Sequence, residues 1–254
     1  MLKTLGIVKG TLLTDKQRRH LFRRLAGKSV LEWVVRQLTD CELLDQVVVL
    51  TDQTESGWLV RSLTPVDIPV FASGKETTIA SLVDILEHHP AESCVFVGAD
   101  WPFLDPTLVD QLIQTALETE IPCDYAAYQF MNEYFSAGRP FGLFPEWYRA
   151  VSLLIAVEQA EDEVHRQLPG CFFLDHQSSF EIELLPAPAG LDRVDIRLTF
   201  DQEDDWENIL VIYDALGTED FDWRKLSNLL HHQPQLRQKM ARLNMNLNTF
   251  ADAH

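Results

Sequence analysis

Short apolar runs alternate with stretches of helical spacing along the first half of the chain. The segment TLGIVKG predicts a first strand that ends at Gly10, and residues 30–38 carry apolar side chains at the spacing of a helix. Further strands are predicted in DQVVVLTD, IPVFAS, SCVFVGAD and CDYAAYQF, and further helices over 76–89 and 105–119. Asp105 and Pro106 suit the cap and the first position of the second of these helices.

This alternation predicts an α/β fold, an open and mostly parallel Rossmann-like sheet with helices on both faces. The rhythm weakens after residue 128, and we predict a small inserted lobe over about 129–192 for acceptor binding or dimerisation. A helix is predicted over 148–168, strands over 179–185 and 193–200, and a helix over 206–216. Residues 1–254 are expected to form one domain, whose helical tail, about 222–254, either covers its own core or pairs two subunits.

Charge and composition exclude two classes of partner. The chain carries 39 acidic and 21 basic side chains, a net charge of -18, which repels nucleic acid and anionic membranes. Apolar runs stay well short of the ~20 residues of a membrane span. The four cysteines are far apart and form no CxxC pair, and the chain opens directly on an apolar strand. We therefore expect reduced cysteines, no signal peptide and a cytoplasmic protein.

Positive charge gathers in a single segment, TDKQRRHLFRRLAGK, residues 14–28, directly after the first strand. Ligands of open α/β sheets bind beyond the carboxyl ends of the strands, and a triphosphate needs cations and free backbone N–H groups there. Gly10 and Gly27 would let the backbone come close to such a ligand. The same segment also fits a solvated amphipathic helix, since Thr14 and Gln17 form a capping-box pattern. Charge alone does not decide between these interpretations.

Two carboxylates follow predicted strands. Asp100 comes directly after CVFVGA, and Asp201 directly after DIRLTF. Converging carboxylates suit Mg²⁺, which prefers hard oxygen ligands and keeps part of its shell for water and phosphates. The alternative for Asp100 is a turn or a helix cap, and for Asp204 we favour helix N-terminal charge. His88–His89 and His231–His232 lack the spacing of a zinc site.

These motifs resemble a known family, the cytidylyltransferase-like sugar nucleotidyltransferases of the glycosyltransferase-A type. The similarity is to the spore coat polysaccharide biosynthesis protein F branch, with the CMP-Kdo and CMP-sialate synthetases as more distant relatives. It spans nearly the whole chain. The segments that carry it are RLAGKSVLEWVVRQL (24–38), VVVLTD (47–52), VFASGKETTIASLVDIL (70–86), VFVGADWPFLDPTLVDQLI (95–113) and DIRLTFDQEDDWENILVIYDAL (195–216).

The resemblance implies a reaction and a set of site residues. A sugar hydroxyl or phosphate attacks the α-phosphate of CTP, and pyrophosphate leaves; the sheet would be of the nucleotide-diphospho-sugar transferase type. Asp100 and Asp201 would bind Mg²⁺, and Lys28, Arg24 and Asp100 would be the catalytic set, the two cations neutralising pyrophosphate. The nucleotide-binding set implied by position is Val8, Lys9, Gly10, Gly27, Lys28, Ser73 and Gly74. The weaker substrate candidates are Asp124, Tyr125 and Glu146.

The chain also departs from the family pattern. About eight extra residues separate Gly10 from Arg24, Ala26 replaces a proline, and Gly142 stands where a sugar-binding glutamate is expected, with Glu146 nearby. Two hypotheses follow. The first is an Mg²⁺-dependent enzyme that acts on a nucleoside triphosphate and a sugar. A homodimer is one of the states open to it. The second is a catalytically degenerate relative that retains the fold and binds nucleotide or sugar.

Overall fold

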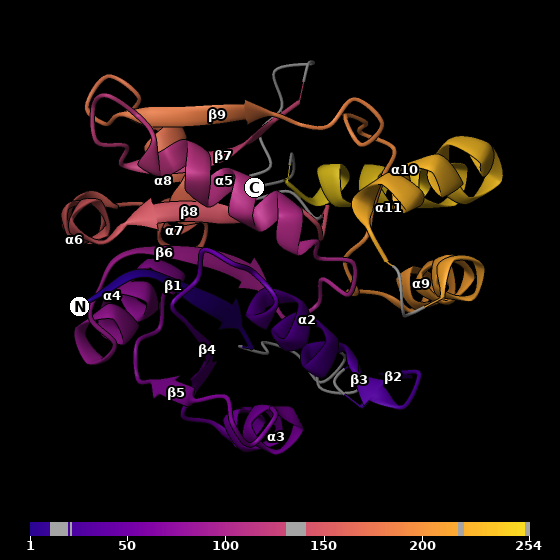
Figure 1. The fold of residues 1–254 in the computed structure, drawn as a ribbon, viewed down its shortest axis with the longest axis horizontal. Helices are drawn as coiled ribbons and strands as arrows, with labels where there is room; N and C mark the ends of the chain where they lie inside the picture. Colours follow the sequence, from indigo (N-terminus) through magenta and orange to yellow (C-terminus); the bar gives the residue numbers. More distant parts are fainter. Residues whose placement is uncertain (11–19, 21, 131–140, 218–220, 252–254) are drawn as a thin grey trace.

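The computed structural model describes residues 1–10, 20, 22–130, 141–217 and 221–251, which build one seven-stranded sheet covered by helices (Figure 1). The sheet order is β5-β4-β1-β6-β8-β7-β9. β5, β4, β1 and β6 are parallel, whereas β8 runs antiparallel to both of its neighbours. The strands are β1 (Leu2–Lys9), β4 (Gln46–Asp52), β5 (Val70–Ser73), β6 (Ala91–Gly98), β7 (Tyr125–Gln129), β8 (Glu146–Arg149) and β9 (Ile182–Pro186). The predicted α/β fold class is thereby confirmed.

The central strands are buried on both faces. In β1, Leu5 and Ile7 pack on one side and Val8 on the other, and all three are fully buried. Continuous apolar runs are typical of parallel strands between two helical layers. One layer holds α2 (Val30–Thr39), α3 (Glu55–Leu63), α5 (Pro106–Leu117), α9 (Glu203–Leu216), α10 (Trp223–His232) and α11 (Pro234–Ala251). The other holds α4 (Thr78–His88), α6 (Ala150–Gln159), α7 (Glu163–Gln167) and α8 (Pro169–Asp175).

The α5 cap agrees with the sequence prediction. The Asp105 carboxylate accepts a hydrogen bond from the backbone N–H of Thr107 at 2.8 Å, and Pro106 opens the helix. The same carboxylate accepts from the backbone N–H of Trp223 at 2.6 Å. This cap therefore also holds the start of α10 against α5. None of the described helices combines the length and apolar character needed to cross a bilayer.

Residues 129–192 do not stand apart as a lobe. Of those the structure describes, Glu146–Arg149 form β8 in the middle of the sheet, and Ile182–Pro186 extend it through β7. Two helices, α6 and α7, replace the predicted helix over 148–168, because Asp162 caps a new helix, and α8 follows from Pro169. Strand pairing thus makes this segment part of the main body.

One other expectation needs correction, whereas the tail follows one of the two alternatives left open. Residues 193–200 do not join the sheet; they approach it through single backbone bonds, from Leu198 N–H to the Phe141 carbonyl and from Phe200 N–H to the Asp100 carbonyl, both at 2.9 Å. The tail covers its own core, since its described apolar stripe is buried against the α5–α9 side. That stripe consists of Leu226, Leu230, Leu236 and Met240.

Candidate active site

The carboxyl edge of the parallel strands collects the candidate residues. β1 ends at Lys9, β4 at Asp52, β5 at Ser73 and β6 at Gly98. Because these strands are parallel, their ends share one edge of the sheet (Figure 1). β8 is antiparallel, so its first residue, Glu146, reaches the same edge and pairs with Phe96 of β6.

Asp100 lies half-buried at this edge. The backbone N–H of Ala99 donates to the Lys9 carbonyl at 3.0 Å, which extends the β1–β6 ladder to the residue before Asp100. The Thr199 hydroxyl donates to Asp100 Oδ2. Burial raises the pKa of the Asp100 carboxyl, and the negative charge of Asp201 raises it further. A cation beside Asp100 would relieve both effects.

Asp201 is brought beside Asp100 by the segment that precedes it. The bond from Phe200 N–H to the Asp100 carbonyl ties the two segments together. The Asp201 carboxylate is 42% exposed, and its Oδ2 lies 3.5 Å from Nη2 of the buried Arg197. The backbone N–H of Asp201 donates to Asp205 Oδ2 at 3.1 Å, which fixes the turn into α9. The Asp100 carboxylate is therefore half-buried, and that of Asp201 faces solvent more fully.

Gly142 allows this segment to approach. Its φ is +70°, and a Cβ there would lie 2.3 Å from the backbone nitrogen of Thr199. Both facts require glycine, because an L side chain would be strained and would displace residues 198–199. The glutamate expected from the family pattern cannot occupy this position without moving the backbone that supports Asp100.

Glu146, which is buried, and Lys9, which is half-buried, are two further titratable groups near Asp100. The Tyr148 hydroxyl donates to Glu146 Oε2, and Lys9 Nζ donates to the Thr78 hydroxyl at 2.9 Å, at the start of α4. Burial lowers the pKa of Lys9, whereas the charges of Asp100 and Glu146 raise it. Burial raises the pKa of Glu146 to about 7. Lys9 is thus within electrostatic range of both carboxylates.

The basic segment is described only at its end, because residues 11–19 and 21, with Lys16, Arg18 and Arg19, lie outside the described residues. The His20 ring stacks on Phe200 at a centroid distance of 4.0 Å. Arg23 Nη2 donates to both carboxylate oxygens of Glu203 at 2.7 Å and its guanidinium lies over Trp206. The described end of the segment is therefore anchored beside the Asp201 turn.

Arg24 and Lys28 lie on a hairpin formed by β2 (Arg24–Leu25) and β3 (Lys28–Ser29). Its two turn residues, Ala26 and Gly27, have φ of +43° and +81°, the conformation of a type I′ turn. Arg24 Nη1 donates to the Gly27 carbonyl at 2.7 Å, and Lys28 Nζ lies 4.7 Å from the Trp33 ring centroid. Among the described contacts, neither cation reaches Asp100 or Asp201.

The remaining residues that were predicted to bind the nucleotide have mainly backbone groups available for a ligand. Val8 is fully buried in the core, and Gly10 N–H donates to the Leu50 carbonyl at 2.8 Å. Ser73 turns its hydroxyl to Asp84 of α4 at 2.5 Å. Gly74 follows at the exposed end of β5, where a Cβ would lie 3.3 Å from Gln53 Nε2. These residues border the edge without presenting charged side chains to it.

Asp124 and Tyr125 lie at the opposite edge. The Asp124 carbonyl accepts from Arg149 N–H at 3.0 Å, and Arg149 pairs with Ser93 near the start of β6. The Asp124 carboxylate accepts hydrogen bonds from the Glu181 N–H and the Ser152 hydroxyl. Tyr125 is fully buried against Phe173. The placement of both residues separates them from Asp100, and we leave them out of the candidate site.

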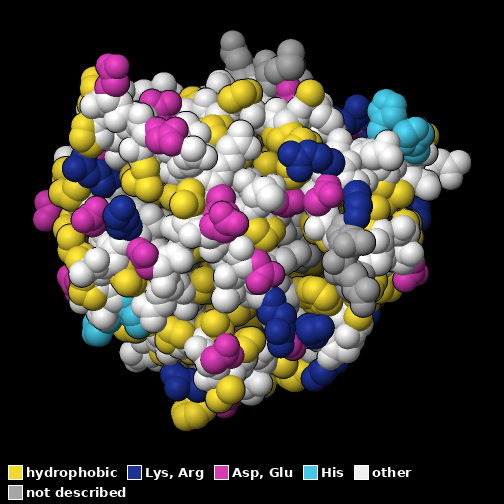
Figure 2. Space-filling view, in the orientation of Figure 1, with side chains coloured by type: hydrophobic (Ala, Val, Ile, Leu, Met, Phe, Trp, Pro, Cys, Tyr) yellow, Lys and Arg dark blue, Asp and Glu magenta, His cyan; other side chains and the backbone are white. Residues whose placement is uncertain are grey.

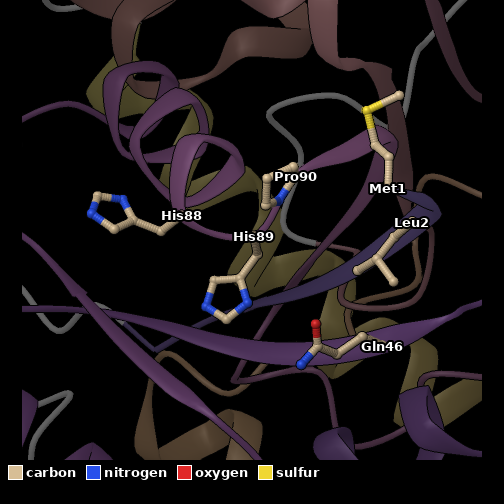
Figure 3. A pocket seen from close by; sticks show the side chains of 6 residues that line it. All are labelled: Met1, Leu2, Gln46, His88, His89 and Pro90. Carbon is tan, nitrogen blue, oxygen red and sulfur yellow. The ribbon is translucent and has the colours of Figure 1, made fainter.

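A cavity of about 330 Å³ also lies at this opposite edge (Figure 3). His88 and His89, at the end of α4, line it together with Met1 and Leu2. His88 Nδ1 is hydrogen-bonded to the Asp84 carbonyl at 2.8 Å. In the part of the chain that the structure describes, no three His, Cys, Asp or Glu side chains are grouped to hold a metal ion.

Comparison with known proteins identifies the family. Residues 16–172, more than half of the chain, match the MobA-like NTP transferase domain. The chain belongs to this family. The chain is 24% identical over 194 residues to the spore coat polysaccharide biosynthesis protein SpsF of Bacillus subtilis, covering 75% of this chain and 76% of that protein. The predicted resemblance to cytidylyltransferase-like nucleotidyltransferases is confirmed.

Solved structures share the fold. A cytidylyltransferase from Leptospira borgpetersenii aligns with this NTP transferase at a TM-score of 0.80 and 15% identity, over 94% of this chain and 98% of that chain. CMP:2-keto-3-deoxy-manno-octonic acid synthetase, solved with CTP, aligns at a TM-score of 0.64 and 13% identity, over 84% and 99%. The shared fold therefore extends past the matched domain, which ends at residue 172.

Sequence reasoning missed three groups of this NTP transferase site. Thr199, Thr78 and Tyr148 bind Asp100, Lys9 and Glu146 respectively. Side chains two residues apart in an extended segment share a face, so Thr199, two residues before Asp201, could have been searched as a partner of Asp100. No local signal marks Thr78 or Tyr148, because each depends on contacts between distant elements.

Proposed function

We propose that this NTP transferase is a Mg²⁺-dependent cytidylyltransferase that transfers CMP from CTP to a sugar, with release of pyrophosphate, for polysaccharide or glycan biosynthesis. The observation that carries the proposal is the joining of Asp100 and Asp201, from distant parts of the chain, by the Phe200–Asp100 backbone bond. The names of the relatives support the choice of substrates, since one synthetase was solved with CTP and SpsF is named for spore coat polysaccharide biosynthesis.

The donor set fits Mg²⁺. Asp100 and Asp201 supply two hard carboxylate oxygens, and the pKa of Asp100 is raised by burial first and by the negative charge of Asp201 second. Mg²⁺ is commonly bound by one or two carboxylates with water and substrate phosphates completing its shell. When bound, the ion would neutralise charge on the triphosphate during transfer.

The chain's own residues would position the triphosphate. A sugar hydroxyl attacks the α-phosphorus and gives up its proton to water, the bond to the bridging oxygen breaks, and pyrophosphate leaves with the electron pair. Such transfer depends mainly on positioning and charge neutralisation. Lys9 is already at the edge, whereas Arg24 and Lys28 would have to exchange the Gly27 carbonyl and the Trp33 ring for phosphate oxygens.

The test is pyrophosphate release from CTP with Mg²⁺ and a panel of sugars. We expect Asp100→Asn and Asp201→Asn to lower the rate by at least about 100-fold. Asp204→Asn is the matched control, because Asp204 is exposed on the first turn of α9 and should retain activity. The proposal fails if no sugar gives release above that of Asp100→Asn.

A binding protein without turnover is the second candidate. The observation in its favour is that Arg24 and Lys28 are both engaged by their own hairpin and helix. A metal-dependent rise in melting temperature with CTP, without pyrophosphate release, would support this alternative. Absence of any shift with any nucleotide would exclude both candidates.

A further inference from the structure

Lys9 is held at the sheet edge by one hydroxyl. Its Nζ donates to Thr78 Oγ1 at 2.9 Å, and Thr78, the first residue of α4, is buried. Among the contacts of the described residues, this is the one hydrogen bond that the ammonium makes. A lysine ammonium has three N–H donors and no acceptor. Two donors therefore remain for a ligand that arrives at this edge.

The Thr78 hydroxyl is oriented by Gln167 of α7. Because the Lys9 ammonium can only donate, Thr78 Oγ1 accepts from it and turns its own proton elsewhere. That proton goes to Gln167 Oε1, at an oxygen–oxygen distance of 3.1 Å. The backbone N–H of Thr78 donates to the same oxygen at 3.3 Å. The three residues thus form one chain of hydrogen bonds with a fixed direction, from the ammonium to the amide.

The amide of Gln167 is also fixed at its nitrogen. Nε2 donates to Glu163 Oε1 at 2.8 Å and to the Glu76 carbonyl at 3.3 Å. A reversed amide would set its NH₂ group against two donors and its oxygen against two acceptors, so one orientation satisfies all four contacts. Gln167 supplies an acceptor that the start of α4 lacks, since the side chain of its N-cap residue, Thr77, makes no capping bond.

Tertiary contacts hold α7 in place around Gln167. A helix of five residues is too short to be stable alone. The Asp162 carboxylate caps it by accepting from the His165 N–H at 2.8 Å, and His165 Nε2 lies 2.8 Å from Asp175 Oδ2 of α8. α7 also packs against α4 and α8 (Figure 1). The position of Gln167 is therefore set by the neighbouring helices.

We propose that Gln167 is a positioning residue for nucleotidyl transfer: through the Thr78 hydroxyl it holds the Lys9 ammonium where the triphosphate arrives. The inference rests on the proposed function. An unanchored lysine side chain populates many rotamers, whereas phosphoryl transfer depends on charges that are already in position. The net charge is -18, and on the face shown in Figure 2 Lys and Arg side chains are interspersed with Asp and Glu. The placement of a single cation therefore matters.

The first test compares pyrophosphate release by matched variants. Gln167→Leu and Thr78→Val each remove one link and should lower kcat by at least about 10-fold, with KM for CTP changed less than ~3-fold. A mobile ammonium still attracts the triphosphate, but it is out of place when charge develops on the leaving group. Thr78→Ser keeps the hydroxyl and should stay within about 3-fold of wild type. Gln111→Leu, exposed on α5, is the control and should change neither constant. Melting temperature checks that each variant folds.

The second test follows Lys9 itself and needs no turnover. In protein labelled with carbon-13 at lysine Cε, the relaxation of the Lys9 signal, assigned by its absence in Lys9→Arg, measures the mobility of the side chain. We expect a rigid side chain in the wild type, Thr78→Ser and Gln111→Leu, and a mobile one in Gln167→Leu and Thr78→Val. Unchanged Lys9 relaxation in the last two variants, full activity of Gln167→Leu, or failure of Thr78→Ser to match an active wild type would each overturn the inference. A wild type that releases no pyrophosphate would refute the proposed function, and Lys9 relaxation would still decide whether Gln167 holds the ammonium.

Discussion

Glu146→Gln should make the protein more stable at pH 8 and leave its stability unchanged near pH 4. Burial raises the pKa of Glu146 from 4.5 to about 7, so the folded state holds this proton more tightly than the unfolded state. The free energy of unfolding therefore falls as the pH rises from 4.5 towards 7. A pKa difference of about 2.5 corresponds to roughly 3 kcal/mol.

Glutamine is isosteric with the protonated acid and can still accept from the Tyr148 hydroxyl. The glutamine variant avoids the loss of stability that ionisation of Glu146 causes at alkaline pH. It also removes the negative charge that raises the pKa of Lys9. The net gain at pH 8 should therefore lie between about 1 and 3 kcal/mol. Urea unfolding of both proteins at pH 4, 6 and 8 measures it, with Glu207→Gln, an exposed site on α9, as the control. Equal destabilisation by Glu146→Gln at every pH would refute the reasoning.

Other substitutions test the supports of the site by urea unfolding. Gly142→Ala should cost well over 2 kcal/mol through clash and strain, whereas Gly27→Ala, at a similar φ with open space around its Cβ, should cost only about 1 kcal/mol; equal costs would contradict the close-approach argument. Arg197→Met should cost about 3 to 5 kcal/mol because it leaves the buried carboxylate of Asp205 unpaired, and a loss below 1 kcal/mol would count against that pair. Asp105→Ala should cost about 2 kcal/mol, since it removes the α5 cap and the bond to the α10 N-terminus; unchanged stability would show that neither bond matters.

The sequence was informative where structure is local. A buried apolar run followed by Asp100 predicts a carboxylate at the sheet edge, and the structure has it there. The cap of α5 followed from Asp105 and Pro106 for the same reason, because capping involves adjacent residues. Asp201 could be paired with Asp100 through the resemblance, whereas the bonds that bring them together join residues about 100 positions apart.

The rest depended on long-range packing. The four residues of β8 show no strand periodicity, and their place between β6 and β7 is decided by pairing with both. Residues 193–200 alternate like a strand, yet Arg197 and Thr199 are as buried as Ile196 and Leu198. The segment is buried on every side instead of pairing with a neighbouring strand. The pattern of residues within one segment cannot reveal this. The hairpin that holds Arg24 and Lys28 is likewise too short for periodicity to predict.

The position of β8 has a consequence for the order in which the fold can form during synthesis. β7 leaves the ribosome before β8, but its hydrogen-bonding partners in the finished sheet are β8 and β9. Until residues 146–149 emerge, the nascent chain can complete only a four-stranded parallel half, and Tyr125–Gln129 must wait unpaired. At ~5–20 residues per second, this interval is on the order of seconds, during which an apolar strand is available to chaperones or to other nascent chains.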